Sequence, residues 1–235
     1  MNDNFSKLEG FLPRILDGLV ITVELTIGGA LLAVIIAIGL GLLARSQHLL
    51  VRGVARFVIE FFRGTSLVVQ LFFFFFVLPL PPFRIDLPPL VVGLIGLGLN
   101  YGAYGAEVVR GSINSVDKGQ WEATTALSMS RTHRMVRVIF PQAWALMIPS
   151  LNNLLIQLLK GTAVVYTITI VDMTAVFNDL RQATSVYFSY SIALVLYFVL
   201  AYILSTLMGL VERRATSKLG RGRPKLVPDM KGVAT

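Results

Sequence analysis

The chain has 235 residues, of which 55% are hydrophobic and only 14% are charged, so an ordinary soluble domain is excluded. It contains no cysteine, which excludes disulfides, thiolate metal sites and cysteine nucleophiles. The net charge of +8 would suit a nucleic-acid-binding protein, but most lysines and arginines gather in three polar stretches between apolar ones. This pattern favours membrane topology and contact with anionic lipid over binding to nucleic acid.

Five stretches are long and apolar enough to cross a bilayer core of about 30 Å as helices. In chain order they are predicted over residues 15–44, 57–79, 88–110, 142–168 and 187–211. The fourth is interrupted by Lys160 and Gly161, so we expect it to be followed by a short re-entrant or irregular piece. The predicted fold class is an all-α polytopic membrane protein.

The three basic stretches fall on one side of the membrane if the five helices alternate in direction. By the positive-inside rule this side is the cytoplasm. We expect His48 and His133 inside, as loop residues rather than metal ligands, and Pro81 and Asp179 outside. The predicted organisation is a short extracytoplasmic N-terminal segment, a transmembrane domain and a basic cytoplasmic tail, at 1–14, 15–211 and 212–235. We expect no cleaved signal peptide, because the N-terminus lacks a basic region followed by a short apolar core.

Small residues recur at helix-packing spacing in the first and third predicted helices: Ala33, Ala37 and Gly41, and Gly98, Gly102 and Ala106. Inside a membrane such residues let two helix backbones approach closely. They predict a packed bundle or a subunit interface.

The polar segment 111–141 carries helix-capping signals. Asp117 can cap a helix that begins at Lys118, with Gln120 in the reciprocal position of a capping box. Ser130 can cap a second helix, and Pro141 suits the first turn of the next membrane helix.

A helix–turn–helix of this kind would expose Trp121, Leu127 and Met129. Such apolar side chains could fill a groove of a partner protein. A plain amphipathic loop at the membrane surface remains the alternative.

This segment resembles the cytoplasmic EAA loop of ABC importer permeases, which docks on an ATP-hydrolysing subunit. Glu122, Ala123 and Pro141 are in register with the EAA pattern. The chain departs from it at Thr124, Ser128, Val138 and Phe140. Ser128 stands where the family has a glycine suited to a left-handed turn.

Two further stretches resemble the polar amino acid branch of that family. Residues 60–70 read E-F-F-R-G-T-S-L-V-V-Q, against a family pattern E-x-x-R-G-T-P-L-x-x-Q. Residues 100–111 read N-Y-G-A-Y-G-A-E-V-V-R-G, against A-Y-x-A-E-x-x-R-(A/G)-G. The resemblance implies the five-helix MetI-like permease core, with the N-terminus outside and the C-terminus inside.

The resemblance also implies a function in the bacterial plasma membrane. The chain would be the permease subunit of a binding-protein-dependent importer, with no catalytic site and no cofactor of its own. Its expected partners are an ATP-binding subunit, an extracytoplasmic solute-binding protein, a second permease subunit of identical or related sequence, and membrane lipid. The chain lacks a Gly-x-x-x-x-Gly-Lys-(Ser/Thr) phosphate loop, so ATP must bind elsewhere. The residues implied to couple to the ATPase are Gln120, Trp121, Glu122, Ala123, Ser128 and Met129.

Charged and amide side chains near apolar spans point to the substrate path. The candidate substrate-binding residues are Glu60, Thr65, Asn100, Tyr104, Gly161 and Thr162. An inter-helix hydrogen bond is an equally open interpretation of Asn100, and ion pairing or snorkelling at the interface is favoured for Arg63, Glu107 and Arg110.

The position after Lys160 bears on the substrate. Relatives often carry an acid there, and this chain has Gly161. A zwitterion or a compact amino acid derivative is therefore favoured over a strongly cationic amino acid. The resemblance extends to permeases for ectoine and hydroxyectoine.

The main alternative function is an ion-coupled secondary transporter of small polar solutes. Such a protein needs intramembrane carboxylates for coupling and usually an inverted repeat. The sequence shows no repeat, and its clean spans lack paired acids. An intramembrane enzyme is disfavoured, because there is no cysteine, histidine pair or His-Glu metal motif.

Overall fold

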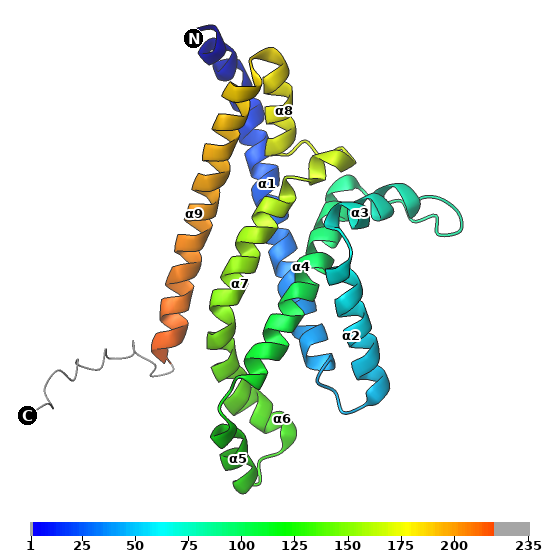
Figure 1. Ribbon diagram of the computed structural model, residues 1–235, viewed down its shortest axis with the longest axis vertical. Coiled ribbons are helices and arrows are strands. Elements are labelled where there is room, and N and C mark those ends of the chain that lie inside the picture. The colour runs from blue at the N-terminus through cyan, green and yellow to red at the C-terminus, as the bar shows by residue number, and fades with distance from the viewer. Residues whose placement is uncertain (1, 219–235) are drawn as a thin grey trace, which may run out of the picture.

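The computed structural model describes residues 2–218, and this part of the chain is helical throughout, without a strand (Figure 1). Residues 219–235, which hold most of the predicted basic tail, lie outside the described part. The elements in order are α1 (Asn2–Leu43), α2 (Leu49–Gly64), α3 (Leu67–Phe72), the π-helical η1 (Phe73–Val77), α4 (Pro89–Asn114), α5 (Lys118–Ala126), α6 (Arg131–Arg134), the π-helical η2 (Met135–Ile139), α7 (Phe140–Thr162), the 3-10 helix η3 (Val165–Ile168), α8 (Met173–Ala183) and α9 (Val186–Lys218).

Within residues 2–218, four helical segments are long and apolar enough to cross a membrane unbroken: Ser6–Leu43, Pro89–Asn114, Arg131–Thr162 and Val186–Arg213. A fifth candidate crossing is formed by α2 together with α3 and η1, which are bent by 103° at their junction. The chain reverses direction at each step, so α8 and the start of α1 lie at one end and α5 and α6 at the other (Figure 1). The predicted polytopic fold is confirmed, but the predicted single helix over 57–79 is wrong.

The first helix begins earlier than predicted, at Asn2 rather than at residue 15. The residues before position 15 are more polar than the rest of the helix, but they still have an apolar side. On that side Leu8, Phe11 and Ile15 pack against Phe177 and Leu180 of α8. Tertiary packing therefore extends the helix beyond the apolar run that indicates a span.

The fourth membrane helix also begins earlier, because α6, η2 and α7 form one continuous helical segment from Arg131 to Thr162. Pro141 has no N–H to donate, and the π-helical turn just before it shifts the pattern, with the Phe140 N–H donating to the Met135 carbonyl. The segment ends at Thr162 rather than at the predicted residue 168, and the irregular piece expected after this helix is present as η3 and the loop to α8.

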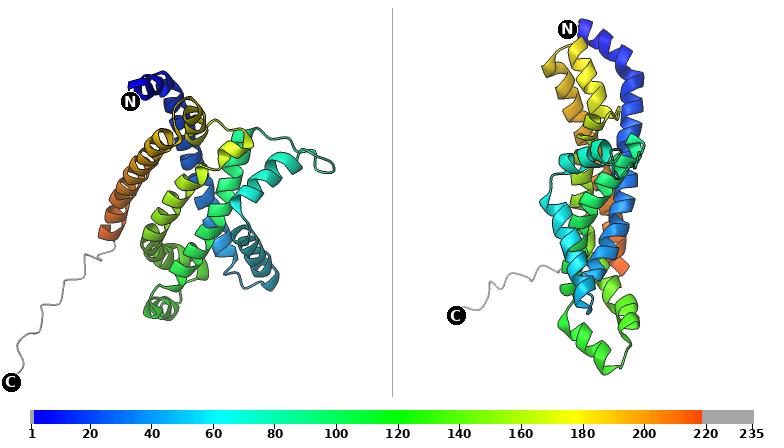
Figure 2. Two further views of the ribbon diagram at one scale, coloured as in Figure 1. Left: turned by 45° about the horizontal axis from the view of Figure 1, so that its top comes forward. Right: turned by 90° about the vertical axis from the view of Figure 1, so that its right-hand side faces the viewer.

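The contact between α1 and α4 is built on glycines, as the small-residue spacing predicted. A Cβ on Gly102 would lie 2.8 Å from the Ile36 side chain, and one on Gly105 would lie 2.7 Å from the Ala37 Cβ. Gly98 likewise leaves room for Leu32. The two helices run against each other through the centre of the molecule (Figure 2).

We predict that Gly41→Ala destabilises the protein and that Gly39→Ala, two residues earlier on the same helix, does not. A Cβ on Gly41 would lie 2.8 Å from the Val109 side chain and 2.9 Å from the backbone oxygen of Ala106, whereas a Cβ on Gly39 meets nothing within 4 Å. Overpacking of this kind lowers the free energy of unfolding by about 1–3 kcal/mol. Unfolding of the detergent-solubilised variants, followed by circular dichroism, measures the difference. Equal stability of the two variants would contradict the assignment of Gly41 to a close helix contact.

Candidate functional site

The second crossing is broken at Thr65 and Ser66. Both residues are extended, with Thr65 at φ −106° and ψ 151°, and Ser66 at φ −69° and ψ 134°. The break leaves carbonyl groups at the end of α2 without their helical donors. In a membrane interior such groups must find partners within the protein.

Two buried amides supply those partners. The Gln70 Nε2 donates to the Phe62 carbonyl at 2.9 Å and to the Thr65 hydroxyl at 2.8 Å. The Asn100 Nδ2, from α4, donates to the same Phe62 carbonyl at 3.1 Å and to the Gln70 Oε1 at 3.3 Å. The Thr65 hydroxyl in turn donates to the Phe61 carbonyl at 2.8 Å. Asn100 and Thr65 therefore hold the broken helix in place.

Two ion pairs flank the break. Glu60 pairs with Arg63 at 3.2 Å on α2, and Glu107 pairs with Arg110 at 2.6 Å on α4. The Tyr104 hydroxyl donates to the Arg63 carbonyl at 3.2 Å, and the Arg63 guanidinium lies 5.4 Å from the centre of the Tyr104 ring. Ion pairing, favoured for Arg63, Glu107 and Arg110, is what the structure shows.

Glu60 differs from the other three charges in its exposure. Its side chain is 70% exposed, whereas that of Arg63 is 32% exposed. The Arg63 Nε is buried and has no hydrogen-bond partner among the described residues. The broken helix therefore presents an accessible carboxylate beside a guanidinium that is only partly satisfied. Together they can bind a solute that carries both charges.

Gly161 and Thr162 do not join this group. A Cβ on Gly161 would collide with the Tyr101 hydroxyl, which donates to the Gln157 carbonyl at 2.8 Å. Thr162 is buried, and its hydroxyl donates to the Leu159 carbonyl at 2.7 Å. No contact recorded within residues 2–218 links either residue to the break. Gly161 thus has a packing reason to be glycine that does not involve the substrate.

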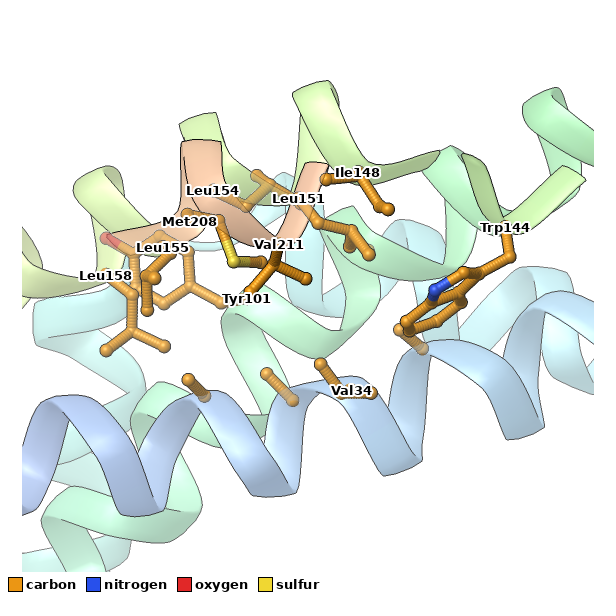
Figure 3. A pocket seen from close by; sticks show the side chains of 14 residues that line it. Val34, Tyr101, Trp144, Ile148, Leu151, Leu154, Leu155, Leu158, Met208 and Val211 are labelled. Carbon is orange, nitrogen blue, oxygen red and sulfur yellow. The ribbon is translucent and has the colours of Figure 1, made fainter. Parts of the chain in front are cut away.

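The pocket in Figure 3 lies between α1, α4, α7 and α9 and is almost wholly apolar. Val34, Trp144, Leu151, Leu155 and Met208 point into it. A zwitterion would lose its hydration there and find almost no hydrogen-bond partners in return. This pocket is therefore suited to an apolar group such as a hydrocarbon chain. The polar break in the second crossing is the better candidate for binding a polar solute.

The predicted helical hairpin is present at the opposite end from α8. The Asp117 side chain accepts from the Gly119 N–H at 2.7 Å, and the Ser130 side chain caps α6. The predicted capping box is wrong in its second half, because the Gln120 side chain accepts from Gln142 Nε2 at 3.1 Å instead. Ser128 adopts φ 53°, the left-handed conformation for which the family pattern has glycine.

The hairpin exposes part of the predicted coupling set. Glu122, Ala123 and Leu127 are exposed, with Leu127 at 75%. Trp121, by contrast, is half-buried, and the Arg45 guanidinium lies 5.6 Å from its ring centre. Met129 is also only partly exposed. The exposed ridge of the hairpin, on α5 and its end, thus includes Gln120, Glu122, Ala123 and Ser128 of the predicted set, while Trp121 and Met129 are partly buried.

Gln70 and Tyr101 were not predicted as site residues. Gln70 belongs to the matched segment 60–70, and an amide in the middle of an apolar stretch is the signal that identifies it. Tyr101 adjoins Asn100 in the other matched segment, but its partner is a backbone carbonyl far along the chain, which no local pattern reveals.

Asp172, a buried carboxylate just before α8, was also not predicted. It is fully buried and accepts from the Thr174 and Ala175 N–H groups at 3.1 and 3.0 Å. Burial raises its pKa, and these hydrogen bonds oppose that rise. Its role is that of a helix cap that fixes α8.

Comparison with known proteins gives a consistent result. Residues 29–217 match the family described as binding-protein-dependent transport system inner membrane component. A probable amino-acid ABC transporter permease protein of Sinorhizobium fredii is 39% identical, over 86% of this chain and 87% of that protein. The L-cystine transport system permease protein TcyB of Bacillus subtilis is 33% identical over 88% of both. The arginine transport system permease protein ArtQ of the same organism is 36% identical, over 92% of this chain and 99% of the relative.

Solved structures agree in fold. A crystal structure of an amino acid ABC transporter with histidines has a chain that superposes with a TM-score of 0.81 at 34% identity, covering 89% of this chain and 98% of that one. An inward-facing MetNI methionine ABC transporter gives a TM-score of 0.72 at 16% identity, covering 88% and 99%. The second likeness concerns the fold alone.

We predict that Gln70→Met destabilises the protein by about 1–3 kcal/mol, because it keeps the side-chain length but leaves the Phe62 carbonyl and Asn100 short of partners. Gln182→Met is the control, since Gln182 is exposed on α8. Chemical unfolding of both variants in the same detergent measures the difference. If both unfold at the same denaturant concentration, Gln70 does not hold the break.

Proposed function

The chain belongs to the family of binding-protein-dependent transport system inner membrane components, and we propose that it is the permease subunit of an ABC importer for a polar amino acid or amino acid derivative. Its place is a bacterial inner membrane, which it crosses several times. It is a transport protein rather than an enzyme. The basic end with α5 and α6 is proposed to face the cytoplasm, in keeping with the positive-inside rule.

One observation carries the substrate class: an accessible carboxylate and a half-buried guanidinium stand 3.2 Å apart beside a broken helix. A zwitterionic amino acid can replace this ion pair with two new ones. Its ammonium group would pair with Glu60, and its carboxylate would pair with Arg63. Charge-assisted hydrogen bonds of both kinds are strong when partly desolvated. Tyr104, stacked against Arg63, closes one side of the site.

Thr65 and Asn100 act in this proposal through Gln70 and the Phe62 carbonyl, so they position the pair rather than touch the solute. Gly161 and Thr162 are proposed to fix the end of α7 against Tyr101. Ectoine and hydroxyectoine combine a carboxylate with a delocalised cation, so they fit the same pair. A Cβ at position 161 would collide with the Tyr101 hydroxyl, so an acid there would require Tyr101 to shift.

The proposed partners follow from the two ends of the molecule. We assign the exposed ridge of α5, with Glu122 and Ala123, to the ATP-binding subunit, along with Gln120, Trp121, Ser128 and Met129 behind or beside it. An extracytoplasmic solute-binding protein would meet the opposite end. A second permease subunit, identical or related, would complete the membrane part.

Uptake by the complete reconstituted complex tests the substrate proposal. Labelled glutamine, cystine, arginine and ectoine are offered in turn, with the ATPase and binding protein present. We expect ATP-dependent uptake of at least one, and Glu60→Gln should lower it about tenfold by removing the carboxylate partner. Glu9→Gln, at an exposed position of α1, is the control. Uptake driven by a proton or sodium gradient without the ATPase would contradict the importer proposal.

A second prediction concerns coupling. Glu122→Arg places a positive charge on an exposed ridge that is already bordered by basic residues, and it should reduce ATP-driven uptake about tenfold or more. Glu122→Gln removes the charge without reversing it and should have a smaller effect. Co-purification of the ATPase and circular dichroism show whether the assembly and the fold survive. Wild-type uptake by Glu122→Arg with the ATPase still bound would contradict the coupling role.

A further inference from the structure

A second charged site lies at the α5–α6 end of the molecule, away from the broken helix. The loop between α1 and α2 and the segment formed by α6 and η2 line an open cleft of about 620 Å³. Arg45 enters it from the first side, and Arg131 and Arg134 enter it from the second. No aspartate or glutamate lines this cleft.

The three guanidinium groups have only neutral partners among the described residues. Arg45 donates to the Asn114 side chain and stacks on Trp121, and Arg131 donates to the Gln47 side chain. Arg134 donates weakly to the Met129 carbonyl at 3.4 Å, and its Nε is buried without any partner. Burial and the positive charge of Arg110 lower the pKa of Arg45.

The cleft also has an apolar wall beside the end of the α1 span. Leu42, in the last turn of the α1 span, lies in it with 37% of its surface exposed, and Val136 with 60%. A small soluble anion gains nothing from such a wall. A phospholipid has a phosphate for the arginines and a glycerol and acyl region for the apolar side chains.

We propose that this cleft binds the phosphate headgroup of an anionic phospholipid. Arg45, Arg131 and Arg134 contact the phosphate, and Leu42 and Val136 contact the adjoining apolar part of the lipid. Arg45 also stacks on Trp121 of α5, so the bound lipid steadies α5 against the end of α1. The lipid site is thereby joined to the hairpin that carries Glu122.

Lipid binding to the purified full chain tests this assignment. The probe is dioctanoyl phosphatidylglycerol, added to protein in a neutral detergent, with the affinity measured by native mass spectrometry. Dioctanoyl phosphatidylcholine and inorganic phosphate are the comparison ligands. We expect tight binding of the phosphatidylglycerol alone, since it has both the net charge and the apolar tail. Equal binding of phosphatidylcholine, or of inorganic phosphate, would overturn the proposal.

Variants separate the cleft from the general positive charge of this end. Arg134→Gln and, independently, Arg131→Gln should weaken phosphatidylglycerol binding about tenfold, the loss of one charged hydrogen bond. Arg137→Gln removes the same charge from an exposed position of η2 outside the cleft and should change the affinity by about twofold or less. Circular dichroism checks that each variant is folded. The same loss in Arg137→Gln as in the cleft variants would show diffuse attraction and overturn the site.

Addition of the ATP-binding subunit distinguishes a lipid site from a protein interface. We expect phosphatidylglycerol to remain bound to the assembled complex, because the arginines lie beside the end of α1 rather than on the exposed ridge of α5. Complete displacement of the lipid by the ATPase would overturn the lipid assignment.

Discussion

The close contact between α1 and α4 sets the position of the other helices in the described chain. Apolar burial drives no association between helices in lipid, so close approach of the backbones must provide the attraction. Gly98, Gly102 and Gly105 on α4 provide it, each with an α1 side chain in the space that a Cβ would fill. From this centre, α4 reaches α2 through Asn100 and α7 through Tyr101. The candidate site and the end of α7 are both attached to the same helix.

The break in the second crossing shows how a polar site can exist at membrane depth. An interrupted helix exposes carbonyls, and these require donors that the apolar surroundings do not supply. Gln70 and Asn100 satisfy the Phe62 carbonyl from two directions, and they are buried in doing so. With the backbone satisfied internally, the Glu60 carboxylate can remain exposed without disrupting the helix end. The amides stabilise the break, and the ion pair is free to interact with a solute.

The parts of the fold that sequence predicts are those set by local composition. Apolar length locates the spans, small-residue spacing locates the α1–α4 contact, and Asp117 and Ser130 locate the hairpin. The break at Thr65 escapes prediction because the uncharged stretch from residue 64 to residue 83 runs through it, and only Gly64 hints at an interruption. Hydrogen bonds between residues distant in the chain also escape prediction. Gln120, for example, accepts a hydrogen bond from Gln142 instead of closing a capping box.

The continuous helical segment from Arg131 to Thr162 has a mechanical consequence. At about 1.5 Å per residue its 32 residues form a helical rod about 48 Å long. It runs from the basic cleft at one end to the Tyr101 contact near the other. There is no loop along it to absorb a displacement, but the π-helical turn before Pro141 and the internal Pro149 both interrupt its regular hydrogen bonding. A displacement of its Arg131 end therefore reaches the Thr162 end without an intervening loop.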